Sequence, residues 1–491
     1  MPRAESGSLS RTRTEPSPSI DQEGERVVRD AIVLGASIAG LAAAAAVAPH
    51  VGAITILERD RLPGVDETRK GVPQGRHVHL MKPAGLHALE RLLPGIEDDL
   101  EQAGAQVLRG GDDFGLHLGG GRLELSDLNP AFALVGATRP LIEGVVRERV
   151  RALPNVEVRT GYDVTGLTAD DAGTVTGVRF RHQGSPATGA SATTDSLRAD
   201  LVIDATGRGS RAPRWLSDLG FASPSEDAVN VDLRYATRLF RRRTGAGQGP
   251  RNVVVAPLPG KPSGAVALAV EGHRWVVTLV GMVGIQPPTE IEAFRAYARA
   301  LWSPAVHDLI ADSEPIGDAA TGGFPSNTRR RYDELRTFPR RFVVTGDALG
   351  AISPVNALGL SMAVLSAEKL GETLARVGPA RIGPAFFRST RRLVAEATTQ
   401  AVDNDLRHPA VQGPRTLRWR VIDAYAKRLM PLAHRDPVVG RALADVMGFL
   451  APGPSLMRPN VAWRVLLRGG RRSTAAPAAP SRVRQHDPLA P

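Results

Sequence analysis

Residues 30–58 contain the pattern that most restricts how this chain can fold. A short apolar run, Asp30–Leu34, precedes a turn of small residues, Gly35–Gly40 (GASIAG). The alanine-rich sequence that follows (LAAAAAVA) strongly favours a helix, and a second apolar run (AITILE) covers 53–58. A strand, a glycine turn, a helix and a second strand predict a βαβ unit within a parallel sheet.

The turn in this unit has the spacing of a dinucleotide-binding loop, G-x-G-x-x-G. In such loops the first glycine makes the turn, the second lets the backbone approach a pyrophosphate, and the third lets the helix pack on the strand. Gly35 and Gly40 match, while Ser37 stands at the middle position and adds a small hydroxyl donor. Ile38 and Ala39 would open the helix, whose N-terminal N–H groups favour an anion.

Glu58 ends the second predicted strand of the unit. An acidic residue about 20 positions beyond the first glycine binds ribose hydroxyls in folds of this kind. Its carboxylate favours an adenosine with free hydroxyls over one that carries a 2′-phosphate. The spacing therefore strengthens the prediction of a nucleotide site.

Two later segments repeat the pattern of a buried strand that enters a turn. Arg340–Ala348 (RRFVVTGDA) delivers Asp347 to a turn that opens a helix, where it either binds a ribityl hydroxyl of a flavin or caps the helix. Ala199–Arg211 (ADLVIDATGRGSR) ends in a glycine-rich turn. This turn either lines a cofactor or nicotinamide site or is an ordinary strand exit.

Composition excludes several classes of function. The chain has 491 residues and no cysteine, so disulfides, thiolate-bound metals and thiol nucleophiles are excluded. The net charge is +11, but residues 451–491 hold seven arginines and one acid, so about half of the excess lies in one segment. With 4% aromatic residues the chain lacks an aromatic-interleaved basic platform, so we expect no nucleic-acid partner.

The termini and the hydropathy predict a cytoplasmic protein. No uncharged apolar run of about 18 residues exists, so no integral membrane segment is expected. Residues 1–27 are polar and lack the apolar stretch of a secretory signal, which predicts a disordered leader. The oligomeric state is left open.

Together, the three motifs in this order resemble those of the FAD-dependent group A monooxygenases of the para-hydroxybenzoate hydroxylase fold. The segment 69–79 (RKGVPQGRHVH), the sequence LLPG at 92–95, and the runs YATRLF and RWVVTLVG give a closer resemblance. They are similar to the flavin epoxidases of polyether pathways and to hydroxylases that act on polyketides.

The resemblance implies an α/β fold: a Rossmann-like FAD-binding domain of the glutathione reductase type, an inserted antiparallel β-sheet substrate domain, and a C-terminal helical region. The run of alternating apolar segments over 229–285 independently favours an antiparallel sheet. The expected division is a leader at 1–27, an FAD-binding domain formed by 28–106, 130–222 and 330–385, a substrate domain formed by 107–129 and 223–329, a helical region at 386–470, and a disordered basic tail at 471–491.

The resemblance also implies the residues that hold FAD, and it leaves the catalytic residues unassigned because the chemistry is centred on the flavin. The adenosine diphosphate half would lie on the first motif and the residues after the second strand. The remainder would lie on the segment of Arg139 and on the segment of Gly346 and Asp347. The implied cofactor-binding residues are Gly35, Ser37, Ile38, Ala39, Gly40, Glu58, Arg59, Arg69, Arg139, Asp347, Pro354 and Gly359.

The implied reaction is oxygenation of a lipophilic polyketide or polyene through a flavin C4a-hydroperoxide, with NADPH or NADH as a transient reductant. Two departures from the family pattern keep an alternative open. Thr206-Gly207 stands where Asp-Gly is usual, and Pro354–Gly359 (PVNALG) replaces a segment that usually carries an aromatic residue and an additional glycine. Because Ala357 and Leu358 would narrow an oxygen pocket, the alternative is an FAD-containing, non-redox [4+2] cyclase that forms a decalin by orienting a linear polyene.

Two further clusters receive a structural interpretation. His77 and His79 form a His-x-His pair without a third ligand nearby, so we expect a loop role and no metal site. Asp112-Asp113 lies in a glycine-rich stretch and is expected to be a solvated turn.

Overall fold

The structure is a computed structural model that describes residues 28–64, 67–69, 71–183, 194–243 and 249–469. The predicted leader at 1–27 and the predicted tail at 471–491 lie outside the described residues. Within these ranges, no helix combines the length and the apolar character that crossing a membrane requires.

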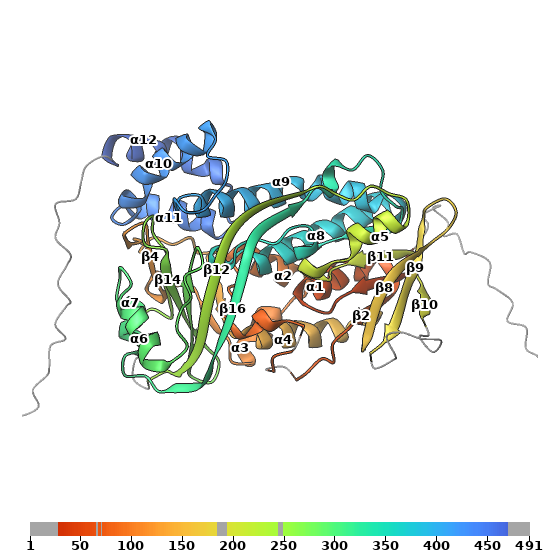
Figure 1. The fold of residues 1–491 in the computed structure, drawn as a ribbon, viewed down its shortest axis with the longest axis horizontal. Coiled ribbons are helices and arrows are strands. Elements are labelled where there is room, and N and C mark those ends of the chain that lie inside the picture. Colours follow the sequence, from red (N-terminus) through yellow and green to blue (C-terminus); the bar gives the residue numbers. More distant parts are fainter. Residues whose placement is uncertain (1–27, 65–66, 70, 184–193, 244–248, 470–491) are drawn as a thin grey trace, which may run out of the picture.

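A five-stranded parallel sheet forms the centre of one of the two main parts of the fold (Figure 1). Its strands, in spatial order, are β17 (Phe342–Val344), β11 (Leu201–Asp204), β1 (Val28–Leu34), β2 (Val51–Glu58) and β7 (Val156–Thr160). The predicted βαβ unit is confirmed, because β1 and β2 pair in parallel with Val33 opposite Ile56. The sheet brings the three motif strands β1, β11 and β17 side by side, so the turns that follow them meet at one edge.

Helices cover this sheet and bury its apolar side chains. α1 (Ile38–Val47) packs against α8 (Gly359–Val377), and α4 (Arg139–Arg151) packs against α1. Apart from Gly40, α1 is made of alanines and larger aliphatic residues that are almost wholly buried, so it carries no polar face. Further helices are α2 (Pro83–Leu92), α3 (Ile96–Gln102), α5 (Ala212–Asp218) and α9 (Ile382–Asp405). A separate antiparallel sheet of β8 (Tyr162–Ala169), β9 (Val175–His182) and β10 (Asp195–Arg198) lies beside the parallel sheet (Figure 1).

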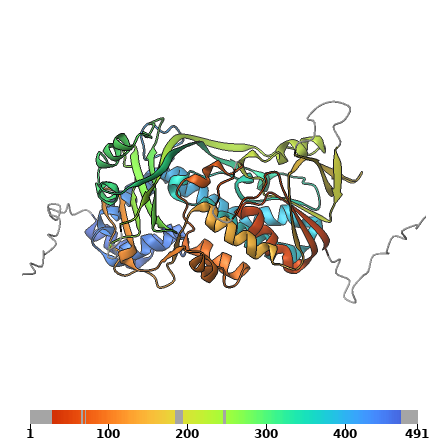
Figure 2. The ribbon, with the colours of Figure 1, turned by 90° about the horizontal axis from the view of Figure 1, so that it is seen from below.

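A seven-stranded sheet forms the second layer of the fold (Figures 1 and 2). Its order is β16 (Pro315–Arg330), β12 (Glu226–Arg241), β15 (Arg274–Gly281), β14 (Ser263–Val270), β13 (Asn252–Val255), β4 (Phe114–Leu118) and β5 (Gly121–Arg122). All its neighbours are antiparallel except β13 and β4, which pair in parallel. The antiparallel sheet predicted from 229–285 is confirmed, and β4, β5 and β16 extend it beyond that range. β3 (Gln106–Leu108) and β6 (Leu134–Gly136) form a small two-stranded sheet.

The remaining helices lie at the end of the molecule beyond the seven-stranded sheet (Figure 1). α6 (Ile291–Arg299) and α7 (Ala305–Ile310) cover one part of that sheet, and α10 (Leu417–Ala433), α11 (Pro437–Met447) and α12 (Pro459–Arg468) cover another. Residues from β4 and β14 share one apolar cluster with residues from α10, α11 and α12. This cluster fixes the C-terminal helices on the sheet.

Candidate functional site

The turns of the three sequence motifs meet at the carboxyl edge of the parallel sheet. Gly35 adopts φ +94°, and a Cβ there would lie 3.0 Å from the carbonyl oxygen of Ala205 in the segment 199–211, called the third motif below. A Cβ on Gly346 would lie 2.7 Å from the Cβ of Ala39. The ideal Cβ position of Gly207 lies 4.0 Å from the Cβ of Asp347. The fold therefore gathers residues that are more than 300 positions apart in sequence into one site.

The first of these turns is built for a backbone–phosphate approach. A Cβ on Gly40 would fall 1.8 Å from the carbonyl oxygen of Gly35, so only glycine allows α1 to pack this close to its own turn. The first N–H groups of a helix have no intrahelical acceptor, and in the described chain α1 has neither a side-chain cap nor an acid in its first turn. An uncapped N-terminus on a buried helix fits the pyrophosphate of a dinucleotide.

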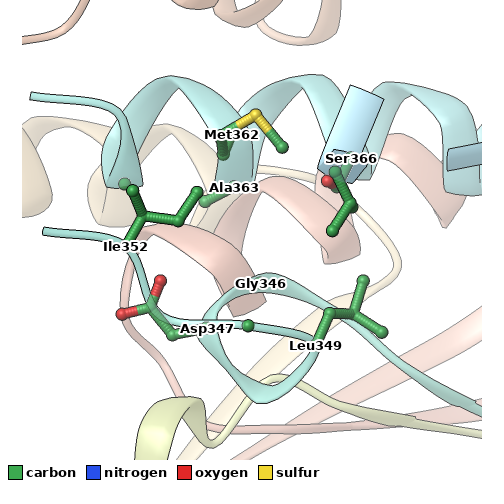
Figure 3. A pocket seen from close by; sticks show the side chains of 10 residues that line it. Gly346, Asp347, Leu349, Ile352, Met362, Ala363 and Ser366 are labelled. Carbon is green, nitrogen blue, oxygen red and sulfur yellow. The ribbon is translucent and has the colours of Figure 1, made fainter. Parts of the chain in front are cut away.

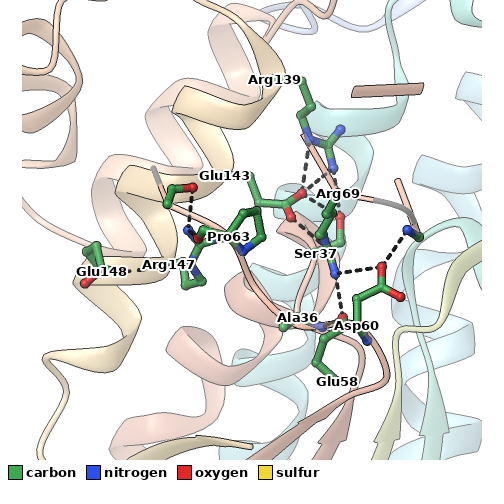
Figure 4. A network of polar contacts seen from close by, with 12 residues as sticks. Ala36, Ser37, Glu58, Asp60, Pro63, Arg69, Arg139, Glu143, Arg147 and Glu148 are labelled. Carbon is green, nitrogen blue, oxygen red and sulfur yellow. Dashed lines mark hydrogen bonds and ion pairs between the residues drawn. The ribbon is translucent and has the colours of Figure 1, made fainter. Parts of the chain in front are cut away.

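Five side chains form a buried polar network next to this helix end (Figure 4). Arg69 bridges Glu58 at 2.8 Å and Glu143 at 2.9 Å. Glu143 accepts hydrogen bonds from the Ser37 hydroxyl at 3.0 Å and from the Arg139 guanidinium at 3.2 Å, and Arg139 also donates to the Ser37 hydroxyl at 2.8 Å. Four predicted residues thus meet, joined by Glu143, which the sequence analysis did not identify.

Glu58 is held as a carboxylate. Burial alone would raise its pKa, but Arg69 and the backbone N–H groups of Asp60 and Ala36 outweigh burial and lower the pKa below its ordinary value. One oxygen accepts from Ala36 N–H at 2.8 Å and from Arg69, while the other accepts, among the described residues, only from Asp60 N–H at 2.9 Å. The second oxygen keeps a lone pair for a ribose hydroxyl.

Arg69 and Arg139 also line a small cavity together with Gly75 and Glu143. The Nε of Arg69 is buried without a hydrogen-bond partner among the described residues. A buried guanidinium with an unused donor, beside a cavity and an uncapped helix end, fits an anionic ligand. Arg59, by contrast, points its side chain outward, 57% exposed, and pairs with Asp60 at 3.8 Å. The structure therefore does not bring Arg59 into the network.

The segment 340–348, which contains Gly346 and Asp347 and is called the late motif below, forms the opposite end of the site (Figure 3). Asp347 lies in the short helix η6 (Gly346–Ala348), and it lines a pocket with Ile352, Gly359 and Met362. Burial raises the pKa of Asp347, while the charges of Arg139 and Arg208 act to lower it. Since no donor to its carboxylate is found in the described part of the chain, its oxygens are available to a ligand. Pro354 opens the helix η7 (Pro354–Asn356) that leads to Gly359 at the start of α8.

The third motif is tied together by Asp204, which stands two residues before the Thr206-Gly207 departure. Asp204 is fully buried and accepts from the Thr206 hydroxyl at 2.6 Å and from the Ser210 hydroxyl at 2.6 Å. Its carboxylate therefore shapes the turn rather than facing the site. The turn itself places Arg208 near Asp347.

The loop 351–358, beside the late motif, is anchored by residues that the sequence analysis missed. Ser353 N–H donates to Asn327 Oδ1 at 2.7 Å, and Asn327 in turn donates to Asp405 at 2.7 Å. Asn404 donates to Asn356 at 2.9 Å. These partners lie 26 to 78 positions apart in sequence, and no motif links them, so only the fold reveals the connection.

Replacing Asp405 with asparagine should stabilise the protein at neutral pH. Burial raises the pKa of Asp405 to about 6, so the fold favours the protonated form and loses stability as the pH rises through about 6. One pKa unit corresponds to about 1.4 kcal/mol, so the variant should gain up to about 3 kcal/mol at pH 8 and almost nothing at pH 4. Urea unfolding at both pH values measures this, with Asp112→Asn as an exposed control. An equal gain at both pH values would contradict a titration of Asp405.

His77 joins the loop 69–79 to the seven-stranded sheet, and His79 bonds to the backbone carbonyl of His77 at 3.0 Å. His77 is buried, its Nδ1 lies 2.7 Å from the Thr237 hydroxyl, and its ring packs edge-on against Tyr235. Burial lowers the pKa of His77 to about 4 and that of His79 to about 3, so both rings are neutral at physiological pH. Within the described ranges no group of three His, Asp or Glu side chains is arranged to hold a metal.

Comparison with known proteins agrees with this geometry. The family model described as "FAD binding domain" matches residues 29–402. Protein Rv3254 of Mycobacterium tuberculosis H37Rv is 32% identical over 418 residues, which cover 83% of this chain and 87% of that protein.

Two solved structures illustrate the fold. p-Nitrophenol 4-monooxygenase PnpA from Pseudomonas putida DLL-E4 is 21% identical with a TM-score of 0.60, and the match covers 85% of this chain and 96% of that one. The Diels-Alderase PyrE3 of the pyrroindomycin biosynthetic pathway is 16% identical with a TM-score of 0.56, covering 85% and 80%. Both similarities concern the fold, which is the one implied by the sequence motifs.

The family match spans most of the chain, and the site that it covers fits FAD at both ends. The chain therefore belongs to the FAD binding domain family, and FAD is the cofactor that its site fits.

Proposed function

We propose that this enzyme inserts one oxygen atom, as an epoxide or a hydroxyl group, into a lipophilic polyketide or polyene intermediate. The balanced reaction takes substrate, O2, NADPH or NADH and a proton, and gives oxygenated product, water and oxidised nicotinamide. Bound FAD supplies the electron transfer and the activation of oxygen. The protein contributes binding, orientation and exclusion of water.

A buried apolar cluster beside the late motif carries this proposal. Tyr235 of β12 and Phe324 of β16 share an apolar cluster with Ala351, which begins the loop that leads to Gly359. The end of β16 bonds directly to this segment, since Thr328 N–H donates to Ala351 at 2.8 Å. Aromatic and aliphatic side chains beside the segment predicted to hold the flavin support an apolar substrate.

Arg208 supports the use of a reduced nicotinamide dinucleotide. Its guanidinium lies 4.7 Å from the centre of the Phe324 ring, and within the described residues it forms no ion pair. Its side chain is exposed beside Asp347, at the turn of the third motif. An exposed cation without a carboxylate partner offers a contact for the phosphates of such a donor.

The cyclase alternative depends on the unusual segment Pro354–Gly359. Leu358 is fully buried and packs with Met362 of α8 and with Ala397 and Ala401 of α9. Its side chain is therefore directed into helix packing, and its bulk gives no reason to expect a narrowed oxygen site. This supports oxygenation over non-redox cyclisation. The remaining argument for cyclisation is the similarity of the fold to that of PyrE3.

Anaerobic mixing of the purified holoenzyme with NADPH, and separately with NADH, tests the proposal. We expect the flavin absorbance near 450 nm to bleach faster when a long linear polyene is present, and to return when air is admitted. An Arg208→Ser variant should need a higher nicotinamide concentration for the same rate. A flavin that stays oxidised under every condition, together with a polyene product of unchanged mass, would reject oxygenation in favour of cyclisation.

A further inference from the structure

The solvent side of α12 carries an apolar surface that the rest of the described chain leaves uncovered. Trp463, Leu466 and Leu467 are 68%, 57% and 58% exposed, and their spacing places them on one side of the helix. Val461 and Val465 face the opposite way and are buried against α10 and α11. α12 therefore has its core contact on one face and a second apolar face, which we call the α12 face, toward solvent.

The α12 face lies within positively charged surroundings. Residues 451–469 contain three arginines, Arg458, Arg464 and Arg468, and no acid. Arg464 pairs with Asp436 at 2.8 Å, whereas Arg458 and Arg468 are exposed and form no ion pair in the described chain. Beyond residue 469 the sequence adds four arginines and one acid.

The neighbouring helix α10 also carries exposed apolar and cationic side chains. Leu417 and Val421 are 77% and 59% exposed, and Arg420 and Arg428 are exposed on the same helix. The backbone of Arg428 lies close to Gly469, directly after the end of α12. Exposed apolar and cationic side chains therefore occur on two adjacent helices at one end of the molecule (Figure 1).

We propose that the α12 face docks the enzyme on the surface of an anionic phospholipid bilayer. Tryptophan and leucine side chains at the solvent face of a short helix enter the boundary between headgroups and acyl chains, and arginines beside them bind the phosphates. A bilayer supplies both parts of the complement, an apolar phase and negative charge. If the proposed function is right, docking of this kind would hold the enzyme at the phase in which its lipophilic substrates dissolve.

Other occupants match this surface less well. A second copy of the chain would bring Arg458 and Arg468 against like charges from the same face. A nucleic acid would use the arginines and stack on Trp463, but it has no use for the aliphatic Leu466 and Leu467. The apolar content thus favours a lipid surface, and the charge favours an anionic one.

Co-sedimentation of the full-length holoenzyme with vesicles tests this inference. We expect retention on vesicles of phosphatidylcholine with about one-third phosphatidylglycerol, and little retention on phosphatidylcholine alone. The variant Trp463→Ser/Leu466→Ser/Leu467→Ser should partition at least about tenfold less. The control variant Val283→Ser/Ile285→Ser, which changes two exposed apolar residues near the seven-stranded sheet, should partition like the wild type.

Further measurements separate the possible outcomes. The variant Arg458→Ser/Arg468→Ser should bind less tightly and should show weaker salt dependence than the wild type. Tryptophan fluorescence should shift to the blue on vesicles, and the shift should be lost in Trp463→Phe. Each variant must retain bound FAD, which shows that it is folded. Absence of wild-type retention, unchanged retention of the triple variant, or a dimer that this variant converts to a monomer without any vesicle binding would overturn the inference.

Discussion

Replacing Gly40 with valine is expected to abolish FAD binding and to destabilise the fold by about 3 kcal/mol or more, at or beyond the upper end of ordinary overpacking costs. Even the Cβ alone would lie 1.8 Å from the carbonyl oxygen of Gly35, so α1 must move away from its own turn. Because α1 is buried against α8 and the parallel sheet, this movement disturbs the core as well as the phosphate-binding turn. The flavin absorbance of the purified protein and its denaturant midpoint measure both effects.

Gly453→Val is the matched control for this prediction. A Cβ at Gly453 meets no atom within 4 Å, and the residue lies in a C-terminal turn far along the chain from α1. The control should keep its flavin and its denaturant midpoint. If Gly40→Val bound FAD as tightly as the control, the close approach of α1 to its turn would not be what positions the cofactor.

The sequence predicted the structure best where a local pattern of residues is enough to specify an element of the fold. The βαβ unit needed only the strand pattern, two glycines and a run of alanines, and the structure confirms it. The three motif turns converge because parallel strands end at one edge of a sheet, which is a general property of such folds. The convergence of these turns was therefore predictable from the strand pattern and the resemblance.

The parts that could not be predicted depend on contacts between distant segments. β16 contains three glycines, two prolines and an aspartate in its 16 residues, a composition that disfavours strands. It forms because it pairs along almost the whole length of β12. The same holds for Glu143, whose importance comes from Arg69, and for Asp405, whose partner Asn327 is 78 positions away.

Arg59, to which the resemblance assigns a cofactor contact, lies outside the buried polar network. Successive side chains of a strand point to opposite faces, so a residue directly after a strand-ending carboxylate is readily directed away from it. The structure has Arg59 largely exposed and Arg69, eleven positions beyond Glu58, buried at 2.8 Å from its carboxylate. The loop that brings Arg69 back is tied by Asp60, which accepts the Gly71 N–H.

Removal of Arg69 is the second change from which we expect a large effect. Arg69→Met should cost about 3–5 kcal/mol of folding free energy at pH 7.5, because two buried carboxylates lose their shared partner. Glu58 and Glu143 have side chains that are 9% and 6% exposed, so water cannot replace the guanidinium. FAD content should fall as well, since the same network holds Ser37, which precedes α1, and Arg139, which begins α4. Denaturant unfolding and flavin absorbance measure the two losses.

Its pH dependence distinguishes this loss from a simple packing defect. Arg69 and the backbone donors keep the pKa of Glu58 below its ordinary value of 4.5, so the stabilisation is present above that pH and is lost as the pH falls through the lower folded-state pKa. The difference between wild type and Arg69→Met should therefore shrink toward pH 4. A cavity left by the missing side chain would instead cost the same at both pH values.

A double-mutant cycle and a matched arginine complete the test. Arg69→Met/Glu143→Gln should be less destabilised than the sum of the two single variants, because neutralising Glu143 removes one of the unpaired charges. Arg59→Met removes an arginine from the same segment but breaks only one long, largely exposed ion pair, so it should change stability by less than about 1 kcal/mol. Equal denaturant midpoints for Arg59→Met and Arg69→Met would show that the buried network does not stabilise the fold. We expect Arg69→Met to have a far lower denaturant midpoint than Arg59→Met. We expect the double variant to lose less stability than the sum of its two single variants. These results would mean that the charges around Ser37 are organised before any nucleotide binds.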